Sequence, residues 1–166
     1  SPYPPAQNSN GQIIRFLYEY PSGDNITPQQ MTYIQQYVDS FEDALASPSF
    51  ANPVTGFRRY ANMYSFVDYF LVNEVSNNVD GYRISTYLHK DKYSNGGKMT
   101  MGSVWDYDIA WGNANYCGGN NTSGWAYQFG NICPGDGWQI PTWWQRMLQD
   151  AAYANAVQCQ WRYWRT

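Results

Sequence analysis

Apolar residues recur at helical spacing in the first third of the chain. Thr27 followed by Pro28 is typical of a helix start, because threonine is a good N-cap and proline suits the first helical position. The apolar residues that follow at this spacing are Ile34, Tyr37, Val38, Phe41 and Leu45. Ser47-Pro48 ends the pattern, since the residue before a proline disfavours helical geometry. A helix is therefore predicted between Pro28 and Ser47.

Two later segments carry similar patterns. One starts near Asn62 and stops around Asn77-Asn78, and residues 141–164, rich in tryptophan and alanine, predict one or two more helices. The apolar stripe of the first of these segments comprises Met63, Phe66, Val67, Phe70 and Leu71.

Strand patterns are fewer. Residues 13–20 (IIRFLYEY) combine β-branched and aromatic residues and predict a strand. Residues 82–91 and 99–109 predict a hairpin around the turn YSNGGK. The expected fold class is therefore α+β, mostly helical, with a small antiparallel hairpin packed on two central helices.

Length and composition narrow the class of protein. The 166 residues suit one domain, with the Pro- and Asn-rich residues 1–12 as a linker. A net charge of −3 supplies no basic surface for nucleic acid, and no apolar run is long enough for a membrane span. Few charges and 31 aromatic rings (7 Phe, 8 Trp and 16 Tyr) favour an exported protein, placed outside the cell, in a periplasm or at the cell surface.

The three cysteines are consistent with export. Cys117 and Cys133 lie in an irregular Gly/Asn-rich stretch, where a bridge would stabilise the fold by roughly 3 kcal/mol in the chain-entropy model. Two free thiols are the alternative. Cys159 falls in a helical pattern and is expected to be a small apolar core residue. The one histidine, His89, is expected to be a surface strand residue and provides no zinc site with these cysteines.

Three acidic residues are candidates for chemistry. Asp80 follows a predicted helix, while Asp106 and Asp108 follow the returning strand of the hairpin. Antiparallel strands would bring these carboxylates together, and grouped oxygen ligands suit magnesium. Because alternate strand residues share a face, Asp106 and Asp108 should point the same way. The alternative is that Asp80 and Asp106 cap turns.

The runs MYSFVDYFLVNEVSNNVDGYRISTYLHKD and MGSVWDYDIAWGN, within residues 63–113, resemble the spore-coat protein H (CotH) kinase family. This resemblance implies an atypical, secreted or surface-bound protein kinase that transfers phosphate from ATP to serine or threonine of a protein or cell-surface substrate. It implies that Asp80 is the catalytic aspartate and Asp106 the magnesium ligand, with Asp108 as a second candidate ligand.

One position departs from the general kinase pattern. Five residues after the catalytic aspartate, protein kinases carry a metal-binding asparagine, whereas this chain carries Ser85. A serine hydroxyl can replace that asparagine as a weaker ligand, and Asn77 or Asn78 could compensate. Ser85 and Asn78 are therefore the predicted residues for binding magnesium and nucleotide.

The resemblance also leaves parts of a kinase unaccounted for. No lysine precedes residue 63, and no glycine-rich loop that could cover a nucleotide is present there. The expectation is a C-terminal lobe that needs the remainder of the kinase domain, its N-lobe, and is inactive alone.

A non-catalytic glycan-binding or structural module is the competing hypothesis. Its candidate sugar-stacking rings are Trp125, Tyr127, Trp138, Trp143 and Trp144, for which ordinary core packing is the alternative. Convergence of the three carboxylates would favour the kinase hypothesis.

Overall fold

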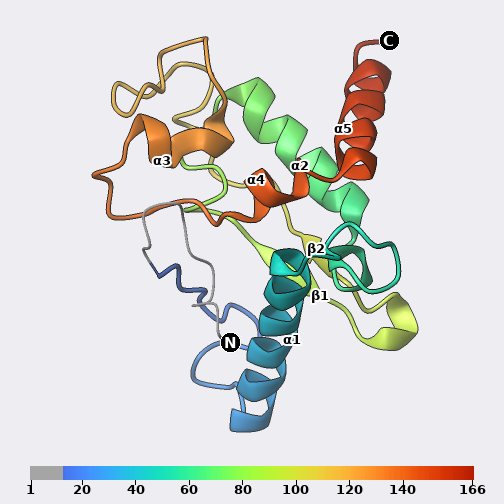
Figure 1. Ribbon diagram of the computed structural model, residues 1–166. Coiled ribbons are helices and arrows are strands. Elements are labelled where there is room, and N and C mark those ends of the chain that lie inside the picture. The colour runs from blue at the N-terminus through green and yellow to red at the C-terminus, as the bar shows by residue number, and fades with distance from the viewer. Residues whose placement is uncertain (1–12) are drawn as a thin grey trace.

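The computed structural model describes residues 13–166, and helices, 3₁₀ turns included, occupy about 42% of these residues. The structure is α+β and mostly helical, with one two-stranded antiparallel sheet (Figure 1). Its helices and strands, in chain order, are α1 (Pro28–Ala46), α2 (Met63–Ser76), β1 (Leu88–Lys90), β2 (Met99–Met101), α3 (Phe129–Ile132), α4 (Trp143–Met147) and α5 (Ala151–Trp164). Short 3₁₀ turns occupy Phe57–Arg59, Tyr93–Asn95 and Ala126–Gln128.

Helix α1 begins as the sequence predicts. The Thr27 hydroxyl accepts a hydrogen bond from the Gln30 amide at 3.3 Å, and the Gln30 side chain accepts one from the Thr27 amide at 2.8 Å. This reciprocal pair is a capping box, with Pro28 at the first helical position. The helix ends at Ala46, before Ser47-Pro48. Both predicted boundaries are confirmed.

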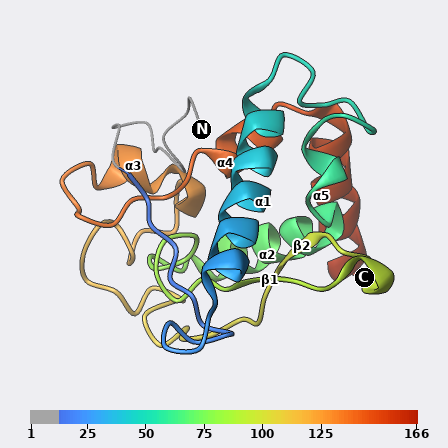
Figure 2. The same cartoon turned by 90° about the horizontal axis from the view of Figure 1, so that it is seen from below.

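Helix α2 runs through the hydrophobic core and packs against α5, whose buried Tyr153 donates to the Phe66 carbonyl at 3.2 Å. Helix α1 reaches the same core through Phe41, whose ring meets that of Trp143 edge-on at 5.0 Å. In Figures 1 and 2 the long irregular segment around α3 lies on one side of the molecule, α5 lies on the other, and α1 lies between them. The predicted helices at 62–77 and 141–164 are confirmed, the latter as two helices.

The sheet is shorter than predicted. Only Leu88–Lys90 and Met99–Met101 pair, with Leu88 opposite Met101 and Lys90 opposite Met99. Flanking residues have positive φ, including Tyr82 (70°), Ser85 (47°) and Asp106 (62°). Because strand geometry has negative φ, these three residues cannot belong to the longer strands that were predicted. The predicted strand at 13–20 is wrong as well: these residues join no strand of the sheet, and Leu17 and Tyr20 are largely exposed.

Three single-residue predictions can be compared with the fold. His89 is exposed on β1, as expected. Cys159 is exposed and free, so its prediction as a core residue is wrong, because α5 buries a different face, which carries Tyr153. The predicted linker at residues 1–12 lies outside the described residues.

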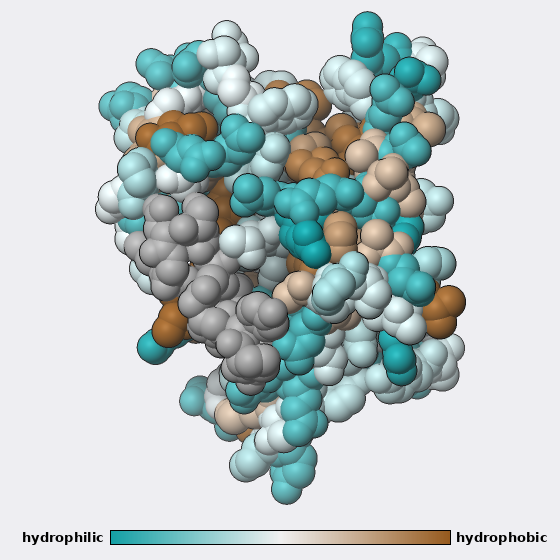
Figure 3. All heavy atoms as spheres, viewed as in Figure 1, coloured by the Kyte–Doolittle hydropathy of each residue, from teal (hydrophilic) through white to brown (hydrophobic). Residues whose placement is uncertain are grey.

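On the part of the face that is described in Figure 3, hydrophobic residues form separate patches among polar ones. Within residues 13–166, no helix has both the length and the apolar character needed to cross a membrane.

Candidate functional site

The candidate site begins where α2 ends. Asn77 has left-handed geometry (φ 46°, ψ 50°), which turns the chain out of the helix. Its side-chain amide donates to the carbonyls of Gly119 and Asn121, both at 3.0 Å. A local helix stop thereby ties the segment that follows α2 to a loop more than 40 residues further along the chain.

A buried asparagine inside α2 supports the next turn. The Asn73 side chain is fully buried, donates to the Tyr69 carbonyl at 2.8 Å and accepts from the Tyr107 hydroxyl at 3.0 Å. A Cβ atom at Gly81 would lie 2.2 Å from the Asn73 Oδ1 atom, so only glycine allows this close approach. Burial raises the pKa of Tyr107, which keeps its hydroxyl a neutral donor.

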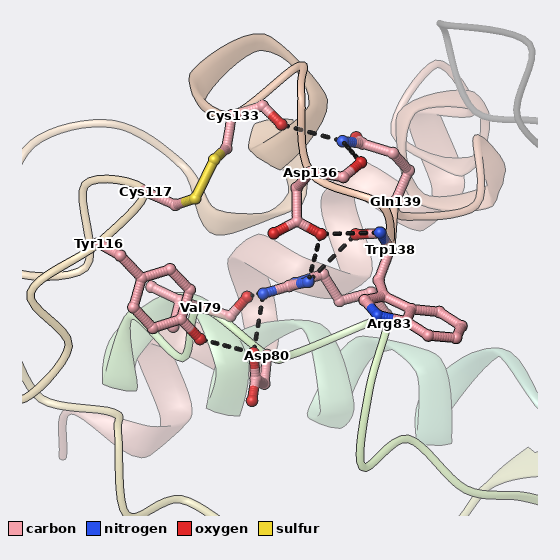
Figure 4. The surroundings of a disulfide bond; sticks show 9 residues. All are labelled: Val79, Asp80, Arg83, Tyr116, Cys117, Cys133, Asp136, Trp138 and Gln139. Carbon is pink, nitrogen blue, oxygen red and sulfur yellow. Dashed lines mark hydrogen bonds and ion pairs between the residues drawn. A yellow bond between two sulfur atoms is a disulfide. The ribbon is translucent and has the colours of Figure 1, made fainter.

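Asp80 is held by contacts to one of its carboxylate oxygens. Its Oδ1 atom accepts from the Arg83 Nη2 atom at 2.8 Å and from the Tyr116 hydroxyl at 3.0 Å (Figure 4). Its backbone amide donates to the Oδ1 atom of buried Asn78 at 3.2 Å. Asn78 therefore stabilises the turn that carries Asp80. The sequence analysis predicted Asn78 as a ligand residue and did not anticipate this contact.

Arg83 is the centre of this network. Its side chain is only 2% exposed, and its Nε atom donates to the Val79 carbonyl at 2.7 Å. Its Nη1 atom donates to Asp136 and to the Trp138 carbonyl, both at 3.1 Å. A buried guanidinium needs such partners, because leaving a charge buried and unpaired costs several kcal/mol. Two carboxylates, from Asp80 and Asp136, share the charge of this one cation.

Sequence reasoning missed Arg83 and Asp136. The Asp80-x-x-Arg83 spacing was a usable signal, because residues three apart meet in a helical turn. Asp136 lies 53 positions beyond Arg83, so nothing local marked that ion pair.

Ser85 and Asp106 are brought together although they are 21 residues apart. The Ser85 hydroxyl donates to the Asp106 Oδ2 atom at 3.1 Å. Both residues have positive φ, which aims their side chains away from the direction that a strand would impose. The two oxygens are hard donors of the kind that Mg²⁺ prefers.

Asp108 takes no part in the hydrogen bond between Ser85 and Asp106. Its backbone carbonyl accepts from the Asn113 side chain at 2.6 Å, and its side chain is exposed. The prediction that a strand directs Asp106 and Asp108 to one face is wrong, because residues 102–109 form no strand and Asp106 has left-handed geometry.

The three candidate carboxylates do not form one tight cluster. Within residues 13–166, the one group of three or more acidic, thiol or imidazole ligands that lie within 4.8 Å of one another is Cys117, Cys133 and Asp136. The two cysteines of that group form the predicted disulfide, with a Cα–Cα distance of 5.3 Å. The expected bridge is therefore present, and its sulfurs lie beside the Asp136 carboxylate.

Glu74, near the end of α2, joins the turn after that helix to the loop between Cys117 and Cys133. Its Oε1 atom accepts from the Tyr82 hydroxyl at 2.8 Å and the Tyr127 amide at 2.9 Å, and its Oε2 atom accepts from the Ala126 amide at 2.8 Å. Burial raises the pKa of this carboxyl above its usual value of 4.5, although all three donors oppose that change.

This shift predicts a pH dependence for the variant Glu74→Gln. With a raised pKa, folded Glu74 binds its proton more tightly than unfolded Glu74, so the stabilisation is present below pH 4.5 and is lost as pH rises through the folded pKa. The free energy of unfolding of the wild type should therefore fall relative to that of Glu74→Gln as pH rises from about 4 to about 7. Urea unfolding of both proteins across this range measures the difference, and parallel profiles would contradict the prediction.

The aromatic residues proposed for glycan binding divide into two groups. Trp143 and Trp144 are buried in the core, so a platform of all five rings is wrong. Trp125 and Trp138 are exposed, and Tyr127 is half-buried against Phe70, with ring centroids 5.7 Å apart.

The chain was also compared with known proteins. A family model described as CotH kinase protein matches residues 6–165, which is nearly the whole sequence. No curated protein and no solved structure matches the chain. The chain therefore belongs to the CotH kinase protein family.

Proposed function

We propose that this chain is the C-terminal part of an atypical protein kinase that transfers the γ-phosphate of ATP to a serine or threonine hydroxyl of a protein substrate. The observation that carries the proposal is the contact between Ser85 and Asp106, which lie on the two segments that flank the hairpin. Asp80, five residues before Ser85, is held by the buried Arg83. Family membership adds weight, because the candidate residues come from the motifs that resemble the family.

In this proposal, Asp80 accepts the proton of the attacking hydroxyl. The hydroxyl oxygen forms a bond to the γ-phosphorus, the bond from that phosphorus to the bridging oxygen breaks, and ADP leaves. Arg83 and Tyr116 hold the Oδ1 atom of Asp80. Their role is to orient the carboxylate, and such positioning is a main source of catalysis in phosphoryl transfer.

The donor set around Asp106 fits a magnesium ion. Asp106 and Ser85 offer a carboxylate and a hydroxyl at the open end of the hairpin, and Asp108 is a second candidate carboxylate. When bound there, Mg²⁺ would neutralise charge on the nucleotide phosphates. Ser85 would supply a weaker ligand than the asparagine of other kinases, while its hydrogen bond keeps the Asp106 carboxylate in place.

The proposal includes an N-lobe supplied by the rest of a longer protein. The first lysine of this chain is Lys90, so no lysine precedes the candidate site to hold the nucleotide phosphates. The 166 residues alone are therefore expected to be inactive and to bind ATP weakly. The disulfide supports a location outside the cell, in a periplasm or at the cell surface, because such bridges persist in oxidising compartments.

Labelling of the full-length parent with radioactive ATP and Mg²⁺ tests the proposal, with the 166-residue chain alone as the inactive comparison. Asp106→Asn is expected to lower transfer by about 10²-fold, the scale of losing one electrostatic contact to the transition state. Asparagine tolerates left-handed geometry, so this substitution preserves the φ of 62° at position 106.

Asp108→Asn is the matched control variant, and we expect its loss of transfer to be clearly smaller. Equal losses in the two variants would remove the distinction between these aspartates. A full-length parent with no Mg-dependent transfer at all would overturn the proposed function.

A further inference from the structure

The disulfide joins the two loop segments that hold Asp80. Tyr116, immediately before Cys117, donates to the Asp80 Oδ1 atom at 3.0 Å. Asp136, three residues after Cys133, accepts from the Arg83 Nη1 atom at 3.1 Å, and Arg83 in turn donates to Asp80 at 2.8 Å. Figure 4 shows that the two sets of contacts, one beside each cysteine of the bridge, both reach the Asp80 carboxylate.

The turn after Cys133 is closed by its own hydrogen bonds. The Asp136 amide donates to the Cys133 carbonyl at 3.1 Å. The buried side chain of Gln139 donates to the carbonyls of Cys133 and Asp136, at 2.9 and 3.1 Å. The turn therefore moves as a unit with Cys133, and the position of that cysteine sets the position of Asp136 and of the Trp138 carbonyl, both of which bind Arg83.

Apart from the bridge, this loop is held by the side chains of Asn77 and Glu74 and by the buried ring of Phe129 rather than by regular structure. Between Cys117 and Cys133 the chain forms one 3₁₀ turn and the four-residue α3.

Closing a loop of 16 residues lowers the chain entropy of the unfolded state by about 3 kcal/mol, so opening the bridge lowers the cost of unfolding this loop by up to about that amount. Arg83 would then keep the Val79 carbonyl and Asp80 on its own segment and the ring of buried Phe129, 4.0 Å from its guanidinium. Its contacts to Asp136 and the Trp138 carbonyl would lose the bridge as an anchor.

We propose that the Cys117–Cys133 disulfide is a redox-sensitive positioning device for Asp80, which acts through Tyr116 and through Asp136 and Arg83. A dithiol reductant would transfer two electrons and two protons to the sulfur–sulfur bond. The dithiol becomes a disulfide, and Cys117 and Cys133 become thiols. Both cysteines are partly exposed, so a small reductant can reach them. The inference rests on the proposed function for its catalytic consequence, and on the geometry alone for the coupling.

The coupling is tested first in the 166-residue chain, without any assay of activity. With ¹⁵N-labelled arginine, the Nε–H group of Arg83 should exchange slowly with water, because it donates to the Val79 carbonyl and its side chain is 2% exposed. Complete reduction with dithiothreitol, verified by mass, should speed this exchange at least about tenfold, because local opening becomes easier. The variant Arg83→Lys assigns the signal.

A second arginine provides the internal control. The Nε atom of Arg146 donates to the Leu45 carbonyl at 3.1 Å, on residues outside the disulfide loop, and its exchange should not change on reduction. Unchanged exchange at Arg83 after full reduction would overturn the proposal. Faster exchange at both arginines would overturn it too, since reduction would then loosen the whole fold.

The catalytic consequence is tested in the oxidised and reduced full-length parent. Reduction should lower kcat by between about tenfold and 10²-fold, the cost of misplacing a catalytic group by about 1 Å, with KM for ATP nearly unchanged. Cys159→Ser, which removes the exposed free thiol, should respond as the wild type does. An active parent whose kcat is insensitive to reduction would overturn this inference alone, whereas an oxidised parent without transfer would overturn the proposed function and leave the exchange test to decide the coupling.

Discussion

Replacing Asp80 by asparagine in the full-length parent is expected to lower phosphoryl transfer by about 10²- to 10⁴-fold, the usual contribution of a general base. Asparagine keeps an oxygen that can accept from Arg83 and Tyr116, so the hydrogen bonds that hold this side chain can persist. What the variant loses is the carboxylate that takes up a proton. Initial rates with labelled ATP and Mg²⁺, measured at saturating ATP, give the fold-change directly.

Asp91→Asn is the matched control for this experiment. Asp91 is exposed at the hairpin, where it accepts hydrogen bonds from the Lys92 amide and the Asn95 side chain. Neither of these contacts involves Asp80. Its replacement should leave the transfer rate within about twofold of the wild type, since surface substitutions of this kind change little. A wild-type rate for Asp80→Asn would exclude Asp80 as the base.

The variant Trp144→Ala should cause the largest loss of stability, about 3–5 kcal/mol of the free energy of unfolding. Trp144 is 1% exposed and packs against the rings of Tyr82 (4.7 Å), Phe66 (5.5 Å) and Tyr69 (6.0 Å). The indole is too large for the neighbouring rings to fill its place, so a cavity remains. Urea unfolding monitored by circular dichroism measures the change.

Trp138→Ala is the control for Trp144→Ala, because it removes an exposed tryptophan ring rather than a buried one. Trp138 is 68% exposed, and its contacts to Asp136 and Arg83 use backbone atoms, which alanine retains. Its replacement should change the free energy of unfolding by less than about 0.5 kcal/mol. Comparable losses in the two tryptophan variants would contradict the assignment of Trp144 to the core.

Loss of Trp144 should also loosen the candidate site, because Trp144 packs on Tyr82, which follows Gly81 in the turn that carries Asp80.

Parts of the fold could be predicted because their signals are local. The N-cap of α1, its proline and the spacing of Phe41 and Leu45 all act within a few residues, and each appears in the structure. The same holds for the end of α2 at Ser76. The strand at 13–20 and the long hairpin failed, because a strand needs a partner, and residues of strand-like composition have none unless tertiary packing supplies one.

The sequence by itself determined the main helices and membership of the family through the motifs around Asp80 and Asp106, and it predicted the bridge between Cys117 and Cys133 that the structure contains. Only the tertiary structure decided what surrounds Asp80. Ser85 and Asp106, both with left-handed backbone, form a hydrogen bond across 21 positions of the sequence. Arg83 and Asp136 form an ion pair across 53 positions. A short segment cannot specify such contacts, because the burial that makes a charged partner necessary exists only once the whole chain has packed.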